Sequence, residues 1–182
     1  GNEQLSQGTQ EYNAGAAKIA AGQAEYDAAE KQYNEKLAEY QAAEKRLNDG
    51  EAQLNDAKAQ RDAAQAKLDA ATPAYQQAQQ LFAFIDKHPA LQIAESILRN
   101  FGFTSLDEAR AAMKEYEDGQ AQLAEANAQI SAAEQEINDG KAQLAAAKTQ
   151  LDNGKEQLAA AKVQLDNGKA ELAAAKNQLD AG

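Results

Sequence analysis

Large apolar residues recur at every seventh position through the C-terminal third of the chain. This stretch, residues 137–182, is close to a perfect 14-residue repeat, and alanine or glycine stands three positions after each leucine of the ladder. The leucines are Leu144, Leu151, Leu158, Leu165, Leu172 and Leu179. One large apolar and one small residue per heptad is the pattern of a coiled-coil seam, so we expect a long helix here.

The same seven-residue ladder begins near the N-terminus and keeps its phase from Leu5 to Phe82. Its large residues are mostly tyrosine and leucine, and small residues again occupy most positions three further on. Lys36 and Arg61 interrupt the pattern, but their aliphatic stems can lie along a seam with the charge at its edge. The N-terminal half therefore predicts a second long helix with a matching stripe of small residues.

Glycines confined to the small position predict close approach of the two helices, nearer than the usual 8–10 Å between axes. The residues expected to form this close-packing seam are Gly22, Gly50, Gly140, Gly154 and Gly168. Folding the two halves about residue 95 places Gly50 near Gly140 and Gly22 near Gly168. A mere low-complexity origin would also put glycines at other heptad positions, where almost none occur.

The alternative interpretation of these glycines is a series of short helices. Glycine in a helix interior costs roughly 0.8–1 kcal/mol relative to alanine. Asn-Gly, as at Asn153-Gly154 and Asn167-Gly168, normally marks a turn. A turn would reset the helical phase, whereas the leucines stay in register across every glycine. The phase therefore favours one continuous helix.

The middle of the sequence, residues 81–106, differs from both flanks because it holds all four phenylalanines and the only histidine. Pro89 predicts that the first helix ends near Asp86 or Lys87, since a residue before proline avoids the α region. Pro89 itself is expected in the first turn of a short helix that extends to about Phe101.

Two further signals predict where the second long helix begins. Gly102 should stop the short helix, as glycine does just after a helix C-cap. Ser105 with Glu108 three residues later is a capping-box signature for the start of the next helix.

These patterns predict an all-α fold, a long antiparallel two-helix coiled-coil hairpin with a small helical head at its tip. We expect a first helix over residues 3–87, a head over residues 88–104 and a second helix over residues 105–181. A helix of about 80 residues would be roughly 120 Å long. A parallel homodimer of each helix is the competing arrangement, but it leaves the head without a purpose.

Composition and charge narrow the range of partners. A formal net charge of −11 makes nucleic acid and anionic membrane surfaces unfavourable partners, because no basic stripe is present to meet their phosphates. No run of 18 or more apolar residues occurs, so we expect no membrane insertion of this segment.

The sequence offers little catalytic chemistry. His88 is the only histidine and cysteine is absent, so neither a His-based triad nor a Cys/His metal site can be assembled within one polypeptide. The carboxylates lie beside lysines at exposed heptad positions, as Asp152 does beside Lys155, which is typical of a solvated helix face. We therefore expect no enzyme activity, metal or cofactor.

The head is the better candidate for contact with a partner. Its aromatic and aliphatic residues exceed what a turn between two helices needs, and most should form a small core. Any that remain exposed would mark an interaction surface. The candidate contact residues are Phe82, Phe84, Ile85, Leu91, Ile97, Phe101 and Phe103.

The repeat LDNGKEQLAAAKVQLDNGK, residues 151–169, and the segment LNDGEAQLNDAKAQ, residues 47–60, carry a family resemblance. They resemble the extracytoplasmic coiled coils of FtsX-like, MacB-related ABC transporter permeases of Gram-positive bacteria. Membrane proteins of the YhgE/Pip type have a similar Leu-x-x-Gly texture. The resemblance covers both helices and rests on repeat texture, so it supplies no site residues.

The permease resemblance implies an extracytoplasmic segment of a cell-membrane protein that acts in mechanotransmission. An ATP-binding subunit elsewhere in the complex would drive the motion, and the head would meet an extracellular protein, a cell-wall partner or a substrate. The alternatives are a coiled-coil spacer of a YhgE/Pip-like membrane protein and the hairpin arm of a cytoplasmic chromosome-organising ATPase.

Overall fold

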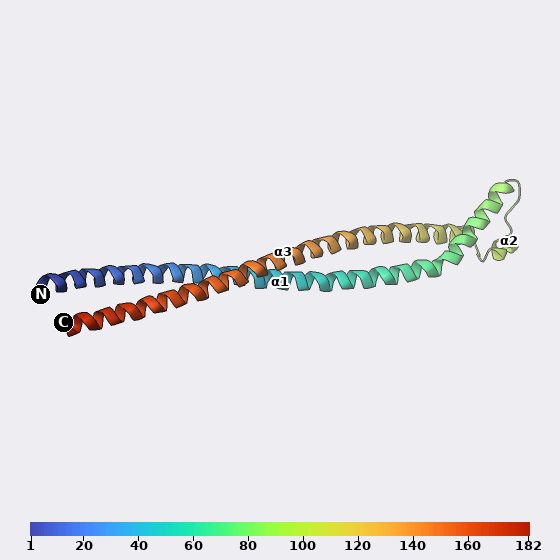
Figure 1. Cartoon of the computed structure of the whole chain (residues 1–182). Coiled ribbons are helices and arrows are strands. Elements are labelled where there is room, and N and C mark those ends of the chain that lie inside the picture. Colours follow the sequence, from blue (N-terminus) through green and yellow to red (C-terminus); the bar gives the residue numbers. More distant parts are fainter. The chain divides into compact units, whose positions relative to one another are not determined.

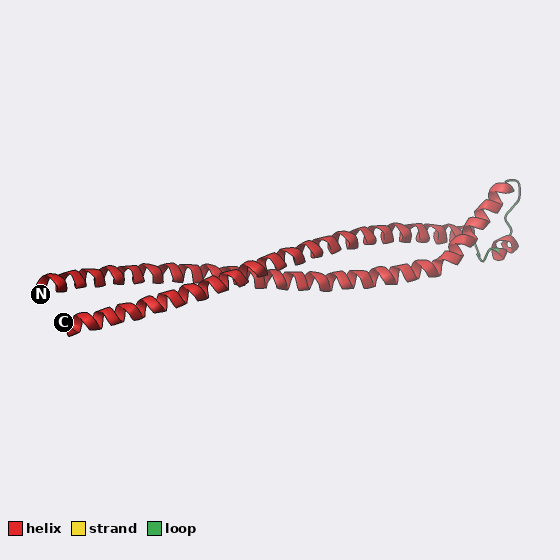
Figure 2. Cartoon of the chain, viewed as in Figure 1, coloured by secondary structure: helices red, strands yellow, loops and turns green.

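The computed structural model describes residues 1–182, and all of its regular secondary structure is helical (Figures 1 and 2). Helix α1 spans Asn2–Lys87, α2 spans Glu95–Asn100 and α3 spans Leu106–Ala181. The two long helices, of 86 and 76 residues, pack against each other. Both continue through every Asn-Gly and Asp-Gly dipeptide, so the alternative of short helices broken at these points is wrong.

The protein divides into two compact units, and the division crosses both long helices. Unit 1 contains residues 1–47 and 140–182, and unit 2 contains residues 48–139. Each is described separately below. Each unit combines a segment of α1 with a segment of α3, because contacts between these helices join residues that are far apart in the sequence.

In unit 1 the first half of α1 lies antiparallel to the second half of α3. The blue N-terminal part of α1 runs beside the red C-terminal part of α3, with both termini on the same side (Figure 1). Leu179, near the end of α3, contacts Gly8, near the start of α1. Tyr33 contacts Gly154 further along, so residue numbers fall on one helix as they rise on the other.

Unit 2 contains a bend in α1 that the heptad ladder did not predict. Pro73 lies inside α1, where it cannot donate the backbone hydrogen bond to residue 69 and its ring crowds the preceding turn. The hydroxyl of the adjacent Thr72 donates to the carbonyl of Leu68 at 3.0 Å, a contact that also tends to bend helices. The green part of α1 changes direction in this region (Figure 1), and we attribute the bend to Pro73.

Helix α1 ends at Lys87, which confirms the boundary predicted from Pro89. The expected helical start at Pro89 is wrong. The amide of Leu91 donates to the carbonyl of His88 at 3.1 Å, so Pro89 occupies the second position of a turn, where its fixed φ is also favourable. Helix α2 begins only at Glu95. Its N-cap residue is Ala94, and no side-chain hydrogen bond caps this end of the helix.

The C-terminus of α2 is closed by a Schellman motif, as the position of Gly102 indicated. Gly102 has φ of 88°, the left-handed conformation that glycine adopts without a Cβ penalty. Its amide donates to the carbonyl of Arg99 at 3.0 Å, and the amide of Phe103 donates to the carbonyl of Leu98 at 3.0 Å. Leu98 and Phe103 are both buried in the same cluster, which supplies the apolar contact that accompanies this motif.

Helix α3 begins with a variant of the predicted capping box. Ser105 is the N-cap, and its Oγ accepts a hydrogen bond from the amide of Glu108 at 3.1 Å. The Glu108 carboxylate accepts from Thr104, one residue before the cap, at 2.8 Å from the amide and 2.6 Å from the hydroxyl. The hydroxyl and the amide of Thr104 hold the pKa of the Glu108 carboxyl below its usual range, because both hydrogen bonds favour the charged form.

Candidate functional site: the interhelical contacts and the head

The contacts of unit 1 follow a single register between α1 and α3. A Cβ at each of six helical glycines of unit 1 would lie 2.6–3.4 Å from a large side chain of the opposite helix. The pairs are Gly8 with Leu179, Gly15 with Leu172, Gly22 with Leu165, Ile19 with Gly168, Tyr33 with Gly154, and Leu47 with Gly140. In each pair the two residue numbers add up to 187. Large residues on each helix therefore meet small residues on the other.

This register corrects the expected pairing of glycine with glycine. Gly22 contacts Leu165 and not Gly168, whereas Gly168 contacts Ile19. Gly140 contacts Leu47, and a Cβ at Gly50 would meet no atom within 4 Å. Folding about residue 95 put the register off by three residues, because the connection between the helices is not symmetric about that point.

The two directions of the contact alternate along unit 1. Leu165 and Leu172 of α3 lie over glycines of α1, while Ile19 and Tyr33 of α1 lie over glycines of α3. The ring of Tyr33 covers Gly154, with Cδ2 3.4 Å from where a Cβ would lie. The pKa of the half-buried Tyr26 is raised by desolvation and by the nearby charge of Glu30. The tyrosines thus serve packing, as their ladder positions indicated.

Unit 2 continues the same large-to-small contact and adds polar ones. Leu68 lies against Gly119, with Cδ1 3.2 Å from where a Cβ would lie, and these two numbers also add up to 187. Arg61 donates to the Asn127 side chain at 3.2 Å, which places its charge at the edge of the interface.

Two further side-chain pairs join α1 to α3 in unit 2. Lys58 and Glu134 form an ion pair of 2.6 Å, but both side chains are partly exposed and such pairs contribute about 0–1 kcal/mol. The rings of Tyr75 and Tyr116 stack with centroids 4.1 Å apart and an angle of 16° between planes. Such an aromatic pair contributes about 0.5–1.5 kcal/mol beyond its area burial.

The head contains a cluster of buried apolar residues, and all three helices contribute to it. Its buried members are Ala78, Leu81, Leu98, Phe103 and Ala109. Leu81 is fully buried, although Phe82 is the residue that continues the heptad ladder. Ala78, at the small position of the ladder, is also fully buried, and Phe82 packs against the cluster from its edge. The ladder therefore could not identify Leu81.

The candidate contact residues of the head are distributed between this core and the surface. Phe103 is buried, and four others are half-buried against the core. These four are Phe82, Ile85, Ile97 and Phe101. Phe84 lies outside the cluster and contacts His88 and Phe101, with ring centroids 4.7 and 5.9 Å away. Leu91 is 46% exposed.

The head residues thus serve mainly to pack α2 against the long helices. Among the large apolar side chains of the head, Leu91 is the exposed one, and the half-buried side chains leave only their outer edges at the surface. The guanidinium of Arg110 lies 5.9 Å from the ring centroid of Phe82, which covers part of that edge.

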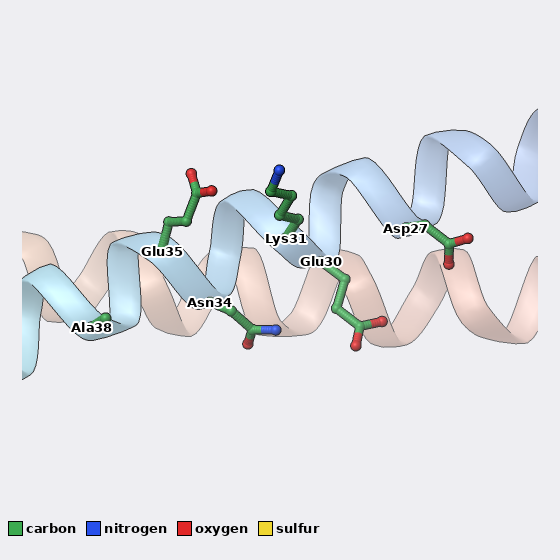
Figure 3. A pocket seen from close by; sticks show the side chains of 6 residues that line it. All are labelled: Asp27, Glu30, Lys31, Asn34, Glu35 and Ala38. Carbon is green, nitrogen blue, oxygen red and sulfur yellow. The ribbon is translucent and has the colours of Figure 1, made fainter.

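A hollow lies on the surface of α1 in unit 1 (Figure 3). It is lined by Asp27, Glu30, Lys31, Asn34, Glu35 and Ala38. All six residues are exposed, and their side chains belong to a single helix. Figure 3 shows Lys31 and Glu35 on one side of the helix and Glu30 and Asn34 on the other. The hollow therefore brings no convergent set of groups onto a ligand.

The structure contains no group of three or more His, Cys, Asp or Glu residues placed to hold a metal ion. None of the three helices is both long enough and apolar enough to cross a bilayer. No protein-family model, curated protein or solved structure matches this sequence.

Proposed function

We propose that this protein is an antiparallel two-helix coiled-coil arm, with α1 and α3 as its strands and α2 as part of its head. The observation that carries the proposal is the constant register in unit 1. Six large-to-small contacts over residues 8–47 and 140–179 share it, and no other element of that unit competes for these faces. One helix can shift along the other only if all six pairs change partner at the same time, so we expect this interface to resist sliding of the two helices.

The arm is proposed to be the extracytoplasmic stalk of an FtsX-like, MacB-related ABC transporter permease. The repeat texture of residues 137–182 and 47–60 supports this assignment. The antiparallel packing of unit 1 is compatible with it, since the contact between Gly8 and Leu179 places the start of α1 beside the end of α3. The stalk would transmit motion from membrane helices that are driven by an ATP-binding subunit, and its head would meet an extracellular or cell-wall partner.

The alternatives are a spacer in a YhgE/Pip-like membrane protein and an arm of a cytoplasmic chromosome-organising ATPase. They differ from the permease stalk in compartment or in partner. The side of the membrane on which the arm lies therefore distinguishes the cytoplasmic arm from the other two. An associated ATP-binding subunit distinguishes the permease from the YhgE/Pip type.

A single introduced cysteine tests the compartment, because the sequence has none of its own. In the full-length protein in its own cells, Val163→Cys places a thiol at a side chain that is 59% exposed. A membrane-impermeant maleimide should label it in intact cells. Labelling only after permeabilisation would exclude an extracytoplasmic stalk. Leu151→Cys is the matched control, because that side chain is buried and should react slowly in both conditions.

Purification from the same cells tests the partner. An ATP-binding subunit that co-purifies with the full-length protein supports the permease. Its absence, together with labelling from outside, favours the YhgE/Pip-like spacer.

A further inference from the structure

Two asparagines of α3 precede glycines that lie in the interhelical contact. They are Asn153, before Gly154, and Asn167, before Gly168, and they are the only Asn-Gly pairs in the sequence. Both asparagine side chains are exposed to water, while the glycine that follows each one faces α1. Every other asparagine is followed by a residue with a side chain.

Asn-Gly is the dipeptide in which an asparagine most readily loses its side-chain amide group. The backbone nitrogen of the glycine attacks the asparagine Cγ, a new bond forms between these two atoms, and the bond from Cγ to Nδ2 breaks to release ammonia. Water then opens the resulting succinimide to aspartate or to isoaspartate, in which the main chain runs through Cβ. The reaction consumes one water and needs no oxidant or reductant.

The α-helix opposes this reaction at both sites. The attack requires rotation of the asparagine away from the helical ψ of about −42°. It also requires a free glycine amide, whereas inside α3 each amide donates to the carbonyl four residues earlier. The helix must therefore open locally before the ring can close.

The contacts of α1 oppose that local opening. The Ile19 Cδ1 atom lies 2.6 Å from where a Cβ at Gly168 would be, and the Tyr33 ring lies 3.4 Å from the same point at Gly154. Local opening of a helix segment breaks its contacts with neighbours as well as its own hydrogen bonds. Each asparagine is thus protected by one identified side chain of the opposite helix.

We infer that Asn153 and Asn167 are sites of spontaneous deamidation gated by the packing of α3 on α1. Deamidation at either site records the opening of its own turn. The isoaspartate product lengthens the backbone by one atom at a glycine that α1 must approach closely. The modified turn cannot restore the original contact, so deamidation makes separation of the helices permanent at that point.

A crossed pair of variants tests the inference. Tyr33→Ala should accelerate deamidation of Asn153 more than that of Asn167, and Ile19→Ala should do the reverse. If each alanine lowers the local opening free energy by about 1.4 kcal/mol, the rate at the matching site rises about tenfold. Peptide mapping by mass spectrometry of the full protein, held at mildly alkaline pH and 37 °C, measures both sites in one sample.

Two internal references complete the experiment. Asn177, which precedes Gln178, should remain unmodified, and the protein unfolded in urea should deamidate rapidly at both Asn-Gly sites. Rates in the folded protein equal to those in urea would overturn protection by the helix. Equal acceleration of both sites by each variant, or no acceleration, would overturn gating by the individual contacts.

Discussion

The Cδ1 atom of Ile19 on α1 lies 2.6 Å from where a Cβ at Gly168 on α3 would stand. Real Cβ contacts are essentially never this short, so alanine at this position requires the isoleucine to move. Gly22, in the same unit, would place a Cβ at an ordinary 3.4 Å from Leu165. Alanine at position 168 therefore requires a neighbouring side chain to move, whereas alanine at position 22 does not.

We predict that Gly22→Ala stabilises unit 1 by up to about 1 kcal/mol, the difference in helix propensity between the two residues. Gly168→Ala gains the same propensity but is expected to be less stable than Gly22→Ala by about 0.5–1.5 kcal/mol, because the end of the Ile19 side chain must leave its preferred rotamer. Thermal and urea unfolding followed by circular dichroism measure both effects.

The control is a double-mutant cycle with Ile19→Val, which removes the Cδ1 atom alone. Ile19→Val should recover most of the stability lost in Gly168→Ala. It should leave the stability change caused by Gly22→Ala unaltered. Stabilisation by Gly168→Ala as large as that by Gly22→Ala would mean that close approach at this glycine is not required.

The register can be tested by disulfide formation, since the sequence has no cysteine. We expect Gly22→Cys with Leu165→Cys to oxidise within one molecule far more readily than Gly22→Cys with Gly168→Cys. The first pair are direct neighbours, whereas the second is offset by three residues. Non-reducing electrophoresis after mild oxidation is sufficient to compare them, with each single cysteine as the control for bonds between molecules. Preferential oxidation of the second pair would show that Gly22 lies opposite Gly168 and would contradict the observed register.

Acid should weaken the start of α3 through Glu108. Its folded-state pKa is lowered by Thr104, so its contribution to stability is present above the unfolded pKa, near the ordinary value of about 4.3. That contribution is lost as the pH falls through the lower, folded pKa. Glu108→Gln should remove this acid-dependent component and leave the pH dependence at neutral pH unchanged.

Ser105→Ala provides the comparison, because it removes a neutral cap hydrogen bond and should cost about 1 kcal/mol at every pH. Helix content and stability measured from neutral to acidic pH separate the two variants. An unchanged acid limb in Glu108→Gln would show that the carboxylate does not stabilise this helix end.

Gly102 is expected to be intolerant of any side chain. Alanine at φ of 88° costs about 1–2 kcal/mol, and its Cβ would also lie 2.8 Å from the Oε1 atom of Gln77. Gln77→Ala should relieve the second effect and leave the first. Denaturation of the two single variants and the double variant measures the residual loss, and full recovery in the double variant would exclude backbone strain.

Leu81 should be the most sensitive apolar position of the head. It is fully buried, so Leu81→Ala is expected to cost about 2–5 kcal/mol through lost burial and a residual cavity. Val163→Ala, at an exposed position of α3, should stay within about 0.5 kcal/mol. Similar losses for both would contradict a packed head.

The all-helical fold and several helix ends could be predicted from local sequence, because each depends on chemistry within a few residues. Lys87 ends α1 before Pro89, Gly102 closes α2 and Ser105 caps α3. The predicted start of α2 was wrong, because Pro89 is equally suited to the first turn of a helix and to the second position of a turn. Only the hydrogen bond from Leu91 to His88 separates these cases.

The pairing across the two helices could not be predicted in the same way. A heptad ladder fixes which face of each helix is apolar, but it does not fix whether the small residues of one helix meet the small or the large residues of the other. The true offset depends on the turn at Pro89, on α2 and on the bend at Pro73, none of which the ladder records. The ladder likewise did not identify Leu81, which is fully buried one position before the ladder residue Phe82.

The candidate contact residues of the head were chosen by composition, and composition does not separate core from surface. Phe103 is 4% exposed and Leu91 is 46% exposed, although both are large and apolar. The difference follows from the backbone, since the Schellman motif places Phe103 beside Leu98, whereas Leu91 closes a turn that contributes no residue to the cluster.

The constant register has a consequence for how such a protein changes over evolution. An insertion or deletion in one helix alone would give every pair beyond it a new partner. Removing fourteen residues from the repeat of α3 together with the fourteen that oppose them in α1 would leave every other large-to-small pair intact. Helix pairs of different lengths can therefore arise by matched duplication or loss of repeats, and the contacts that remain need not change.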